Sequence, residues 1–517
     1  MIATIMPIST NTTIAICIQI QVGDMAEHSV SAAISAGRQP ARRPLKGAWA
    51  IACGVKLSGA APRAGLYAAR MAGCLSGPAG CLGRTIALLL AIVAVACSVA
   101  SVAYAQGRPS GHASTTPPLG GVNIAGLSNV ADGPRAHAEI AAAVRLHAKV
   151  VRIEVPWSTF EPTDARIDPV ALAGTDRLMA DATAAGIRVI AIVDSTPCWA
   201  SSAPASVLRR CNVHRAGRAN AWPPRHAAGY ASFVAFLAQR YGTRLAAIEV
   251  WNEPDQINQL YFAGPHKAVR YATILKAAYR AIKQANPQVT VLAGSIVGSN
   301  GVFLRALYAA GIKGYYDGLA VHYYTLVLAA LREIHEVQLQ NGDPTPLWLD
   351  EFGWSSCYPR HRLEQEQACV TPAIQARNLA SALHSLARAP YVAATVVYDL
   401  QDNRSEQFGM LTAGGGRKPA FAALAGALAN PLANPPAVAL SLRTAGGRTV
   451  ASGSAPVGDV MQLEVFQGSV ARYRALFTLD RFNRYSLALP AVLGTSGLRV
   501  RVFQWWAGAA RDAQASN

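Results

Sequence analysis

Residues 248–254 read Ile-Glu-Val-Trp-Asn-Glu-Pro, and residues 347–354 read Leu-Trp-Leu-Asp-Glu-Phe-Gly-Trp. Each stretch is an apolar run of strand length that ends in a glutamate, Glu253 in the first and Glu351 in the second. Short apolar runs of this kind are typical of buried strands, and a carboxylate at the end of one needs a partner or a function. Other strand and helix patterns separate the two stretches, so we expect both glutamates at the same mouth of one barrel.

The surrounding sequence alternates between strand and helix patterns from residue 119 to residue 430. Candidate strands are 121–126, 150–155, 187–193, 245–251, 289–294, 318–323, 346–350 and 393–398. Candidate helices are 136–147, 170–185, 227–240, 266–285, 301–311, 374–388 and 419–429. This alternation predicts an α/β fold, a closed parallel (β/α)8 TIM barrel. No Gly-x-Gly-x-x-Gly motif follows a candidate strand, which argues against a dinucleotide-binding domain.

The pattern changes after the barrel, in residues 431–510. Short alternating segments occur at 437–442, 448–452, 460–466, 472–478, 485–489 and 498–505, with turn residues between them. They predict a small antiparallel β-sandwich packed on the barrel. Trp505 and Trp506 could bind sugar there, but neighbouring strand residues point to opposite faces, so packing is the favoured interpretation.

The N-terminal 105 residues are expected to be an extension with a signal peptide. Arg84 precedes an apolar run, 86–104, and the segment ends in an Ala-x-Ala sequence at Ala105. This pattern predicts secretion to the periplasm or beyond, followed by a linker at 106–118. The competing interpretation is an uncleaved membrane tether, because the run approaches the length that spans a bilayer. Met71 is an alternative start of the chain.

The overall composition fits a globular protein, with 51% apolar and 15% charged residues. The net charge is +18, of which the first 105 residues contribute +6, from eight Lys and Arg against two Asp and Glu. The remaining charge is spread over 412 residues without a dense basic run or a nucleic-acid motif. We therefore expect no nucleic-acid partner.

Four cysteines follow the signal segment: Cys198, Cys211, Cys357 and Cys369. An even number in an oxidising compartment indicates disulfides, and three connectivities are open. The pairs 198–211 and 357–369 each fall within one candidate loop, whereas free buried thiols remain the alternative. No Cys or His spacing suggests a metal site, and no cofactor is expected.

The two glutamates have a chemical interpretation. Active sites of (β/α)8 barrels lie at the C-terminal ends of strands, where Glu253 ends the fourth candidate strand and Glu351 the seventh. Cleavage of a glycosidic bond requires one carboxylic acid and one carboxylate on either side of a sugar carbon. The alternative is that both are ordinary solvated acids at strand ends.

Five motifs then occur in the order of a known family. They are Val151-Arg152-Ile153-Glu154-Val155-Pro156-Trp157, Trp251-Asn252-Glu253-Pro254, His322-Tyr323-Tyr324, Trp348-Leu349-Asp350-Glu351-Phe352-Gly353-Trp354 and Tyr398-Asp399-Leu400. Over roughly residues 119–510 the chain resembles the retaining glycoside hydrolases of clan A. Within the clan it is most similar to family 39, the type of bacterial exopolysaccharide glycosidases and β-xylosidases.

The resemblance implies a role for each matching residue. Glu253 would be the acid/base, Glu351 the nucleophile and Asn252 the ligand of the sugar 2-hydroxyl. Supporting residues would be Arg152 beneath the nucleophile, Tyr324 bonded to it, His322 on the same strand as Tyr324, Trp354 beside it and Tyr398, where the family often has Trp. For Arg152 an ordinary interior ion pair, and for His322 a core histidine, remain alternatives.

The expected function follows from these roles. It is a secreted retaining O-glycosyl hydrolase that acts by double displacement on a β-linked polysaccharide or exopolysaccharide. The expected partner is a carbohydrate polymer or oligosaccharide. A non-catalytic polysaccharide-binding protein and a transglycosylase are the alternatives, and the sequence leaves endo- and exo-action equally open.

Overall fold

The computed structural model describes residues 7–10, 13–16, 117–124, 133–212, 217–324, 327–359, 369–403, 405–434, 437–455, 460–480, 482–504 and 512–516. The chain forms two compact units, Met1–Ser110 and Gly111–Asn517. In the first unit, β1 (Pro7–Thr10) pairs with β2 (Thr13–Ile16) in antiparallel fashion. The expected signal segment 84–105, most of the linker, Met71, Trp505 and Trp506 lie outside the described residues. Within the described part of the chain, no helix is both long enough and apolar enough to cross a membrane.

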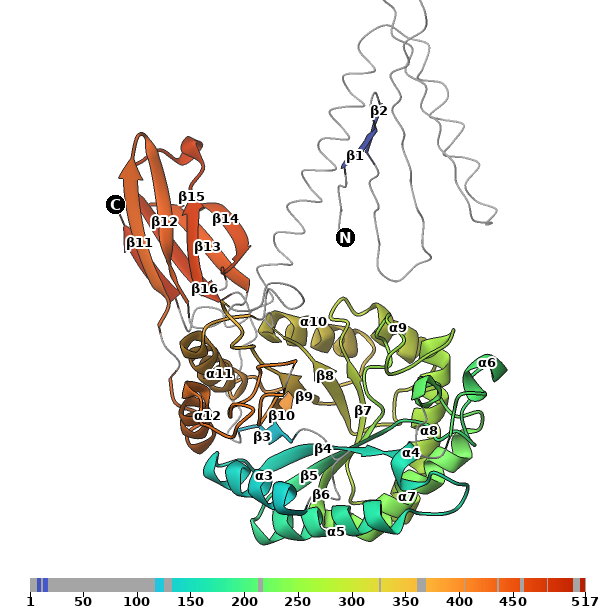
Figure 1. Ribbon diagram of the computed structural model, residues 1–517. Coiled ribbons are helices and arrows are strands. Elements are labelled where there is room, and N and C mark those ends of the chain that lie inside the picture. The colour runs from blue at the N-terminus through green and yellow to red at the C-terminus, as the bar shows by residue number, and fades with distance from the viewer. Residues whose placement is uncertain are drawn as a thin grey trace, which may run out of the picture. The chain divides into compact units, whose positions relative to one another are not determined.

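Eight parallel strands close into a barrel in the order β10-β3-β4-β5-β6-β7-β8-β9 (Figure 1). The strands are β3 (Leu119–Asn123), β4 (Val150–Pro156), β5 (Arg188–Asp194), β6 (Leu245–Val250), β7 (Val291–Ile296), β8 (Gly318–His322), β9 (Leu347–Phe352) and β10 (Val392–Val397). The predicted (β/α)8 fold is therefore confirmed, although the first strand begins and ends a few residues earlier than expected.

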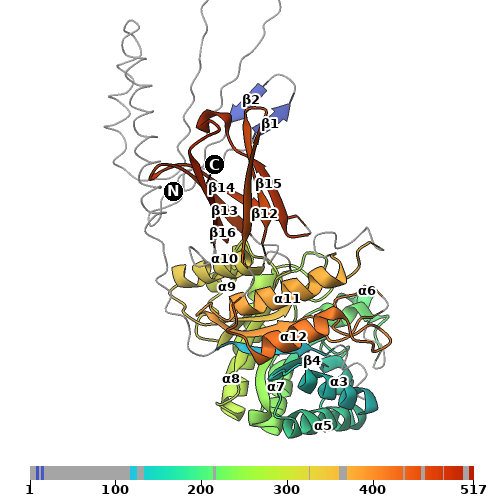
Figure 2. The same ribbon diagram turned by 90° about the vertical axis from the view of Figure 1, so that its left-hand side faces the viewer.

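Helices surround these strands on the outside of the barrel (Figure 1). They are α3 (Gly133–Arg145), α5 (Pro169–Ala184), α7 (Ala227–Tyr241), α8 (Lys267–Ala285), α9 (Val302–Ala309), α10 (Val327–Gln340), α11 (Pro372–Leu386) and α12 (Pro419–Ala429), with short turns α4 (Trp157–Phe160) and α6 (Ala205–Leu208). Helix α10 was not among the predicted helices. Helices α11 and α12 lie side by side (Figure 2).

Two of these helices show how local sequence sets their starts. Asp168 precedes α5, and its carboxylate accepts hydrogen bonds of 2.9 Å from the backbone N–H groups of Val170 and Ala171. The Thr371 hydroxyl caps α11 in the same way, because it accepts a hydrogen bond from the backbone N–H of Ile374. Each cap is followed by a proline, whose missing N–H costs nothing in the first helical turn.

Apolar side chains, most of them from the first halves of the strands, fill one end of the barrel interior. We call this cluster the barrel floor; it comprises Val150, Ile190, Ala246, Ala247, Leu292, Ala320, Trp348, Ala394 and Val396. A larger apolar cluster fills the space between the strands and the helices. The floor closes the barrel at one end, which leaves the C-terminal ends of the strands for polar residues.

The C-terminal region forms two antiparallel sheets, as predicted. One sheet has the order β11-β12-β15 and the other β14-β13-β16-β17. Their strands are β11 (Ala439–Ala445), β12 (Arg448–Ser454), β13 (Val460–Gln467), β14 (Val470–Thr478), β15 (Arg484–Ala488), β16 (Leu498–Gln504) and β17 (Asp512–Ser516), the last of which was not predicted. An apolar core joins the two sheets. The Asn483 amide donates a buried hydrogen bond of 2.6 Å to Asn378 on α11, which ties the sandwich to the barrel.

Candidate active site

The backbone bends sharply where β5 and β6 end. Ser195, Trp251 and Glu253 have φ angles of +63°, +74° and +43°. Non-glycine residues rarely occupy this left-handed region, and those that do concentrate at functional sites. The reversal at Trp251 buries the indole completely, and its Nε1 donates to the Tyr261 carbonyl at 2.8 Å. The chain that follows carries Glu253 to the mouth of the barrel.

Glu253 and Glu351 meet at this mouth with His322 beside them. One oxygen of each carboxylate and one His322 nitrogen all lie within 4.8 Å of one another. The Nδ1 atom of His322 is 2.8 Å from Glu253 Oε1 and 3.5 Å from Glu351 Oε2. Gln256 donates to the second oxygen of Glu253. The two carboxylates that the sequence singled out therefore face the same small space.

Glu351 is held by two donors. Arg152 Nη1 bonds to Oε1 at 2.7 Å, and the Tyr324 hydroxyl donates to Oε2 at 2.9 Å. Burial and the charge of Glu351 raise the pKa of Tyr324 well above its ordinary value, so the phenol keeps its hydrogen. The two donors, one of them charged, fix the orientation of the Glu351 carboxyl group.

Arg152 connects the residues around it. Its Nε and Nη2 atoms bind both oxygens of Glu249, at 2.7 and 3.0 Å, and it also reaches Asn123 at 3.1 Å and Asn252 at 3.2 Å. Burial opposes the charge of Arg152, but the neighbouring carboxylates outweigh it and hold its pKa above the usual value. Arg152 thus forms an interior ion pair with Glu249, which is the alternative noted from the sequence. It also binds Glu351.

Two consecutive acids on β9 reach the same cluster, which regular strand alternation would forbid. The pairing of β8 with β9 shifts between Val321–Leu349 and His322–Glu351, so Asp350 is an extra residue on β9. A bulge of this kind turns neighbouring side chains toward one side. As a result Asp350 lies 3.5 Å from Arg152 Nε, while Glu351 lies 2.7 Å from Arg152 Nη1.

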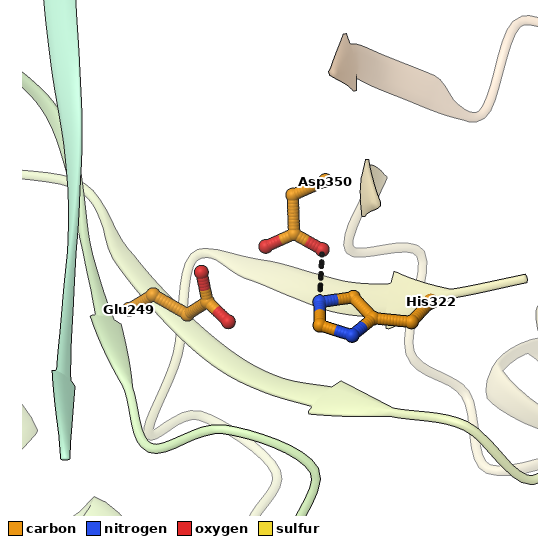
Figure 3. A group of neighbouring side chains, drawn as sticks. All are labelled: Glu249, His322 and Asp350. Carbon is orange, nitrogen blue, oxygen red and sulfur yellow. Dashed lines mark ion pairs between the residues drawn. The ribbon is translucent and has the colours of Figure 1, made fainter. Parts of the chain in front are cut away.

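Beneath the two glutamates, Glu249, His322 and Asp350 point toward one another (Figure 3). Burial, followed by the charge of Glu249, raises the pKa of Asp350 well above its ordinary value. Glu249 has the opposite shift, because Arg152 outweighs the effect of burial and lowers its pKa. The two neighbouring carboxyl groups therefore have pKa values shifted in opposite directions. These groups could reach a shared metal ion, but the guanidinium of Arg152 already supplies their positive charge.

A second pair of carboxyl groups lies at the ends of β4 and β5. Glu154 follows Arg152 by two residues on the same face of β4, and its carboxyl is within hydrogen-bond range of Asp194. Burial and the charge of Glu154 raise the pKa of Asp194 to about 8. Burial and the neighbouring carboxyl group thus shift the pKa of Asp194 in the same direction.

The other predicted site residues have clear positions. Asn252 Oδ1 accepts from Arg152 and from Ser295 at 3.3 Å. The Tyr398 hydroxyl donates to Glu406 at 2.8 Å, and its ring meets that of Tyr324 edge-on. Trp354 is only 2% exposed and belongs to the core between strands and helices, so it offers little surface to a sugar.

The predicted cysteine pairs are present. Cys198 is bonded to Cys211 and Cys357 to Cys369, each closing a short loop after a barrel strand. The local pairing favoured by the sequence is confirmed, and the alternative of free thiols is excluded for these four residues.

Sequence reasoning missed several charged groups of the site. Glu249 was visible within an apolar strand, where burial of a carboxylate already demands a cationic partner. Glu154 carried the same signal two residues after Arg152. Asp194 had a weaker one, as a polar residue at the end of an apolar strand.

No protein-family model matches this chain, and no curated protein matches it. Solved structures similar to it include a family 39 glycoside hydrolase from Bacteroides cellulosilyticus WH2, with 18% identity, coverage of 72% of this chain and 81% of that chain, and a TM-score of 0.48. The family 39 enzyme from Xanthomonas axonopodis pv. citri has 14% identity, 75% and 93% coverage, and a TM-score of 0.46. The family 39 β-xylosidase from Caulobacter crescentus has 16% identity, 69% and 84% coverage, and a TM-score of 0.44. Likeness at this level carries no conclusion about chemistry.

Proposed function

We propose that this protein is a retaining glycoside hydrolase with Glu253 as acid/base and Glu351 as nucleophile. The observation that carries the proposal is the approach of the two carboxylates, with oxygens within 4.8 Å, at the C-terminal mouth of a (β/α)8 barrel. Retaining enzymes have carboxyl groups about 5 Å apart, whereas inverting enzymes need roughly 6.5–9.5 Å to admit a water. The separation favours direct attack by one carboxylate.

The first step forms a glycosyl–enzyme ester. Glu351, held by Arg152 and Tyr324, attacks the anomeric carbon while Glu253 gives its proton to the leaving oxygen. The Arg152 cation is bonded to Glu351, so the role of proton donor is assigned to Glu253. His322, 2.8 Å from Glu253, fixes the direction in which that carboxyl points.

The second step hydrolyses the ester. Glu253, now ionised, takes a proton from an incoming water, which attacks the anomeric carbon and releases Glu351. Asn252, tied to Arg152 and Ser295, is in the position of the residue that binds the 2-hydroxyl in the family it resembles. Proton transfer of this type contributes about 10²–10⁴-fold to the rate.

We further propose that the substrate is a β-linked polysaccharide or exopolysaccharide outside the cytoplasm. The two disulfides support an oxidising compartment, because such bonds rarely persist in the cytosol. The polymeric substrate rests on the family resemblance alone.

The test is hydrolysis of a panel of aryl β-glycosides and β-linked polysaccharides by the wild type, Glu351→Ala and Glu253→Gln. Glu336→Gln, an exposed acid on α10, is the matched control and should keep wild-type activity. Hydrolysis that survives both site substitutions would overturn the proposal. Absence of hydrolysis across the panel, with binding retained, would instead favour a polysaccharide-binding protein.

Two further measurements address the mechanism. A 2-fluoro sugar with a good leaving group should label Glu351, as peptide mass spectrometry can detect. Proton NMR during the first minutes of hydrolysis should show the β-anomer of the product. Initial release of the α-anomer would contradict retention, and sugar–sugar products in place of free sugar would indicate a transglycosylase.

A further inference from the structure

The proposed acid/base Glu253 is held at both of its carboxyl oxygens. His322 Nδ1, at the end of β8, lies 2.8 Å from Oε1. The side-chain amide of Gln256 donates from Nε2 to Oε2. Gln256 lies in the loop after β6, and its backbone N–H also bonds to the Glu253 carbonyl at 3.2 Å. The loop therefore folds back and places the Gln256 side chain against the acid.

A chain of hydrogen bonds in the same loop fixes which way the Gln256 amide faces. The backbone N–H of Leu260, which can only donate, bonds to Asn258 Oδ1 at 3.1 Å. Asn258 therefore has its amide nitrogen left for another partner, and this Nδ2 donates to Gln256 Oε1 at 2.6 Å. Because the oxygen of Gln256 is occupied in this way, its nitrogen is the atom that meets Glu253.

The backbone around Gln256 is anchored on two neighbouring parts of the barrel. The Asp255 carboxylate accepts a hydrogen bond of 2.8 Å from the backbone N–H of Gly298, in the loop after β7. Lys267, at the start of α8, donates from Nζ to the Gln256 carbonyl. The position of Gln256 against Glu253 is therefore set by contacts to the barrel as well as by the loop itself.

A general acid gains from a contact at its second oxygen. The terminal torsion of a glutamate is soft, so a carboxyl group held at one oxygen can still rotate. Proton transfer requires a defined orientation, and a misplacement of about 1 Å can cost about 10²-fold in rate. The hydrogen bond from Gln256 also becomes charge-assisted once Glu253 has lost its proton, and such bonds are roughly twice as strong as neutral ones. The contact therefore strengthens as the leaving group departs, which is the condition for accelerating the step.

We propose that Gln256 is a positioning residue for the acid. It orients the Glu253 carboxyl group for proton transfer and stabilises the carboxylate that the transfer leaves, while Asn258 fixes the Gln256 amide. The inference rests on the proposed function, because it requires Glu253 to be the proton donor. Since Gln256 acts through Glu253, its substitution should affect only substrates whose leaving group needs that proton.

The experiment uses Gln256→Met, which keeps nearly the length of the side chain and removes the donor. Two β-glycosides of the sugar that the wild type hydrolyses best are compared, because kcat/KM reports the first step for both. For the phenyl glycoside, whose leaving oxygen needs a proton, we expect kcat/KM to fall about 10–100-fold, through kcat and with KM nearly unchanged. For the 2,4-dinitrophenyl glycoside, which needs no proton, we expect a change of less than about 3-fold.

A second background separates positioning from a general loosening of the loop. In Glu253→Gln the proton donor is already absent, so adding Gln256→Met should change the residual hydrolysis of the phenyl glycoside by less than about 3-fold. A substitution that only loosened the loop would instead lower the activity by the same factor in both backgrounds.

Asn258→Ala and Gln259→Ala are a matched pair within the loop. Each removes a side-chain oxygen that accepts from a backbone N–H, that of Leu260 in the first case and that of Gly264 in the second. Only Asn258 also contacts Gln256. Asn258→Ala should therefore lower kcat/KM for the phenyl glycoside by about 3–10-fold and spare the dinitrophenyl glycoside. Gln259→Ala should match the wild type on both.

The inference would be overturned if Gln256→Met lost activity equally on both glycosides, lost none on the phenyl glycoside, or lost as much again in Glu253→Gln. If Gln256→Met does not fold, as its Tm would show, the comparison of Asn258→Ala with Gln259→Ala decides. Failure of the proposed function looks different, because Glu253→Gln itself would then affect the two glycosides alike. A leaving-group dependence in Glu253→Gln without one in Gln256→Met would refute the role of Gln256 alone.

Discussion

The two ends of the barrel are built from the same eight strands but by opposite rules. At the floor, side chains such as Leu292 and Ala320 are completely buried and apolar. At the mouth, only a few residues further along the strands, Arg152 binds Glu249 and Glu351. β9 shows both rules within one strand, since Trp348 belongs to the floor and Glu351 to the mouth.

The difference separates stability from function along each strand. Apolar packing at the floor stabilises the fold without demanding particular partners, so its residues can be exchanged at a cost that depends on volume. The buried charges of the mouth are stabilising only as a complete set, because one charge without its partner is strongly unfavourable. Substitutions at the two ends should therefore have different signatures.

The largest effect is expected for Arg152→Met. It leaves Glu249 buried without its cation, so we expect a loss of about 3–5 kcal/mol in the free energy of unfolding, together with nearly complete loss of hydrolysis. Urea unfolding and aryl glycoside kinetics are the measurements. Arg240→Met, which breaks an exposed pair with Asp176, is the control and should cost less than about 1 kcal/mol. Equal stability of the two variants would refute the comparison.

Glu253→Gln should reduce the rate of hydrolysis and leave the stability of the fold nearly unchanged. We expect a fall of about 10²–10⁴-fold in kcat/KM for substrates whose leaving group needs a proton. Activated aryl glycosides should be less affected, since a nitrophenolate leaves without protonation. Glu351→Gln should reduce both kinds of substrate alike. A Glu253 variant with the same loss on every leaving group would argue against its role as the acid.

At the floor, Leu292→Ala should reduce the stability of the fold and leave catalysis nearly unchanged. Removing a completely buried leucine costs about 2–5 kcal/mol, while the kcat of the molecules that remain folded should stay near the wild-type value. Leu339→Ala on α10, where the side chain is 54% exposed, is the matched control and should change stability little. A large fall in kcat for Leu292→Ala would mean that floor and mouth are mechanically coupled.

The contrast also explains what the sequence could predict. Periodicity revealed the barrel, because alternating strand and helix patterns are a property of each segment alone. Glu253 and Glu351 were found because a carboxylate that ends an apolar strand is unusual, and this structure brings them together. The joint inward placement of Asp350 and Glu351 could not be found, since it depends on the bulge against β8, which only the pairing of two strands defines. Trp354 was expected near the sugar because of its position in the chain, but packing decides that it is buried.

The smallest predicted effect concerns the pH dependence of stability at the second carboxyl pair. The pKa of Asp194 is about 8 in the folded protein, mainly through burial, against 3.8 as the ordinary value. The folded state therefore binds the proton more tightly than the unfolded chain, so the wild type should lose stability as the pH rises from about 4 to about 8. Asp194→Asn lacks this proton and should become more stable relative to the wild type over that range, as Tm values at pH 5 and pH 8.5 would show.

For Asp176, whose hydrogen bond to Arg240 lowers its pKa, the sign is opposite and its effect is confined to acidic pH. Asp176→Asn should therefore keep a constant difference from the wild type between those two pH values. If Asp194→Asn did the same, burial and the charge of Glu154 would not be raising the pKa of Asp194.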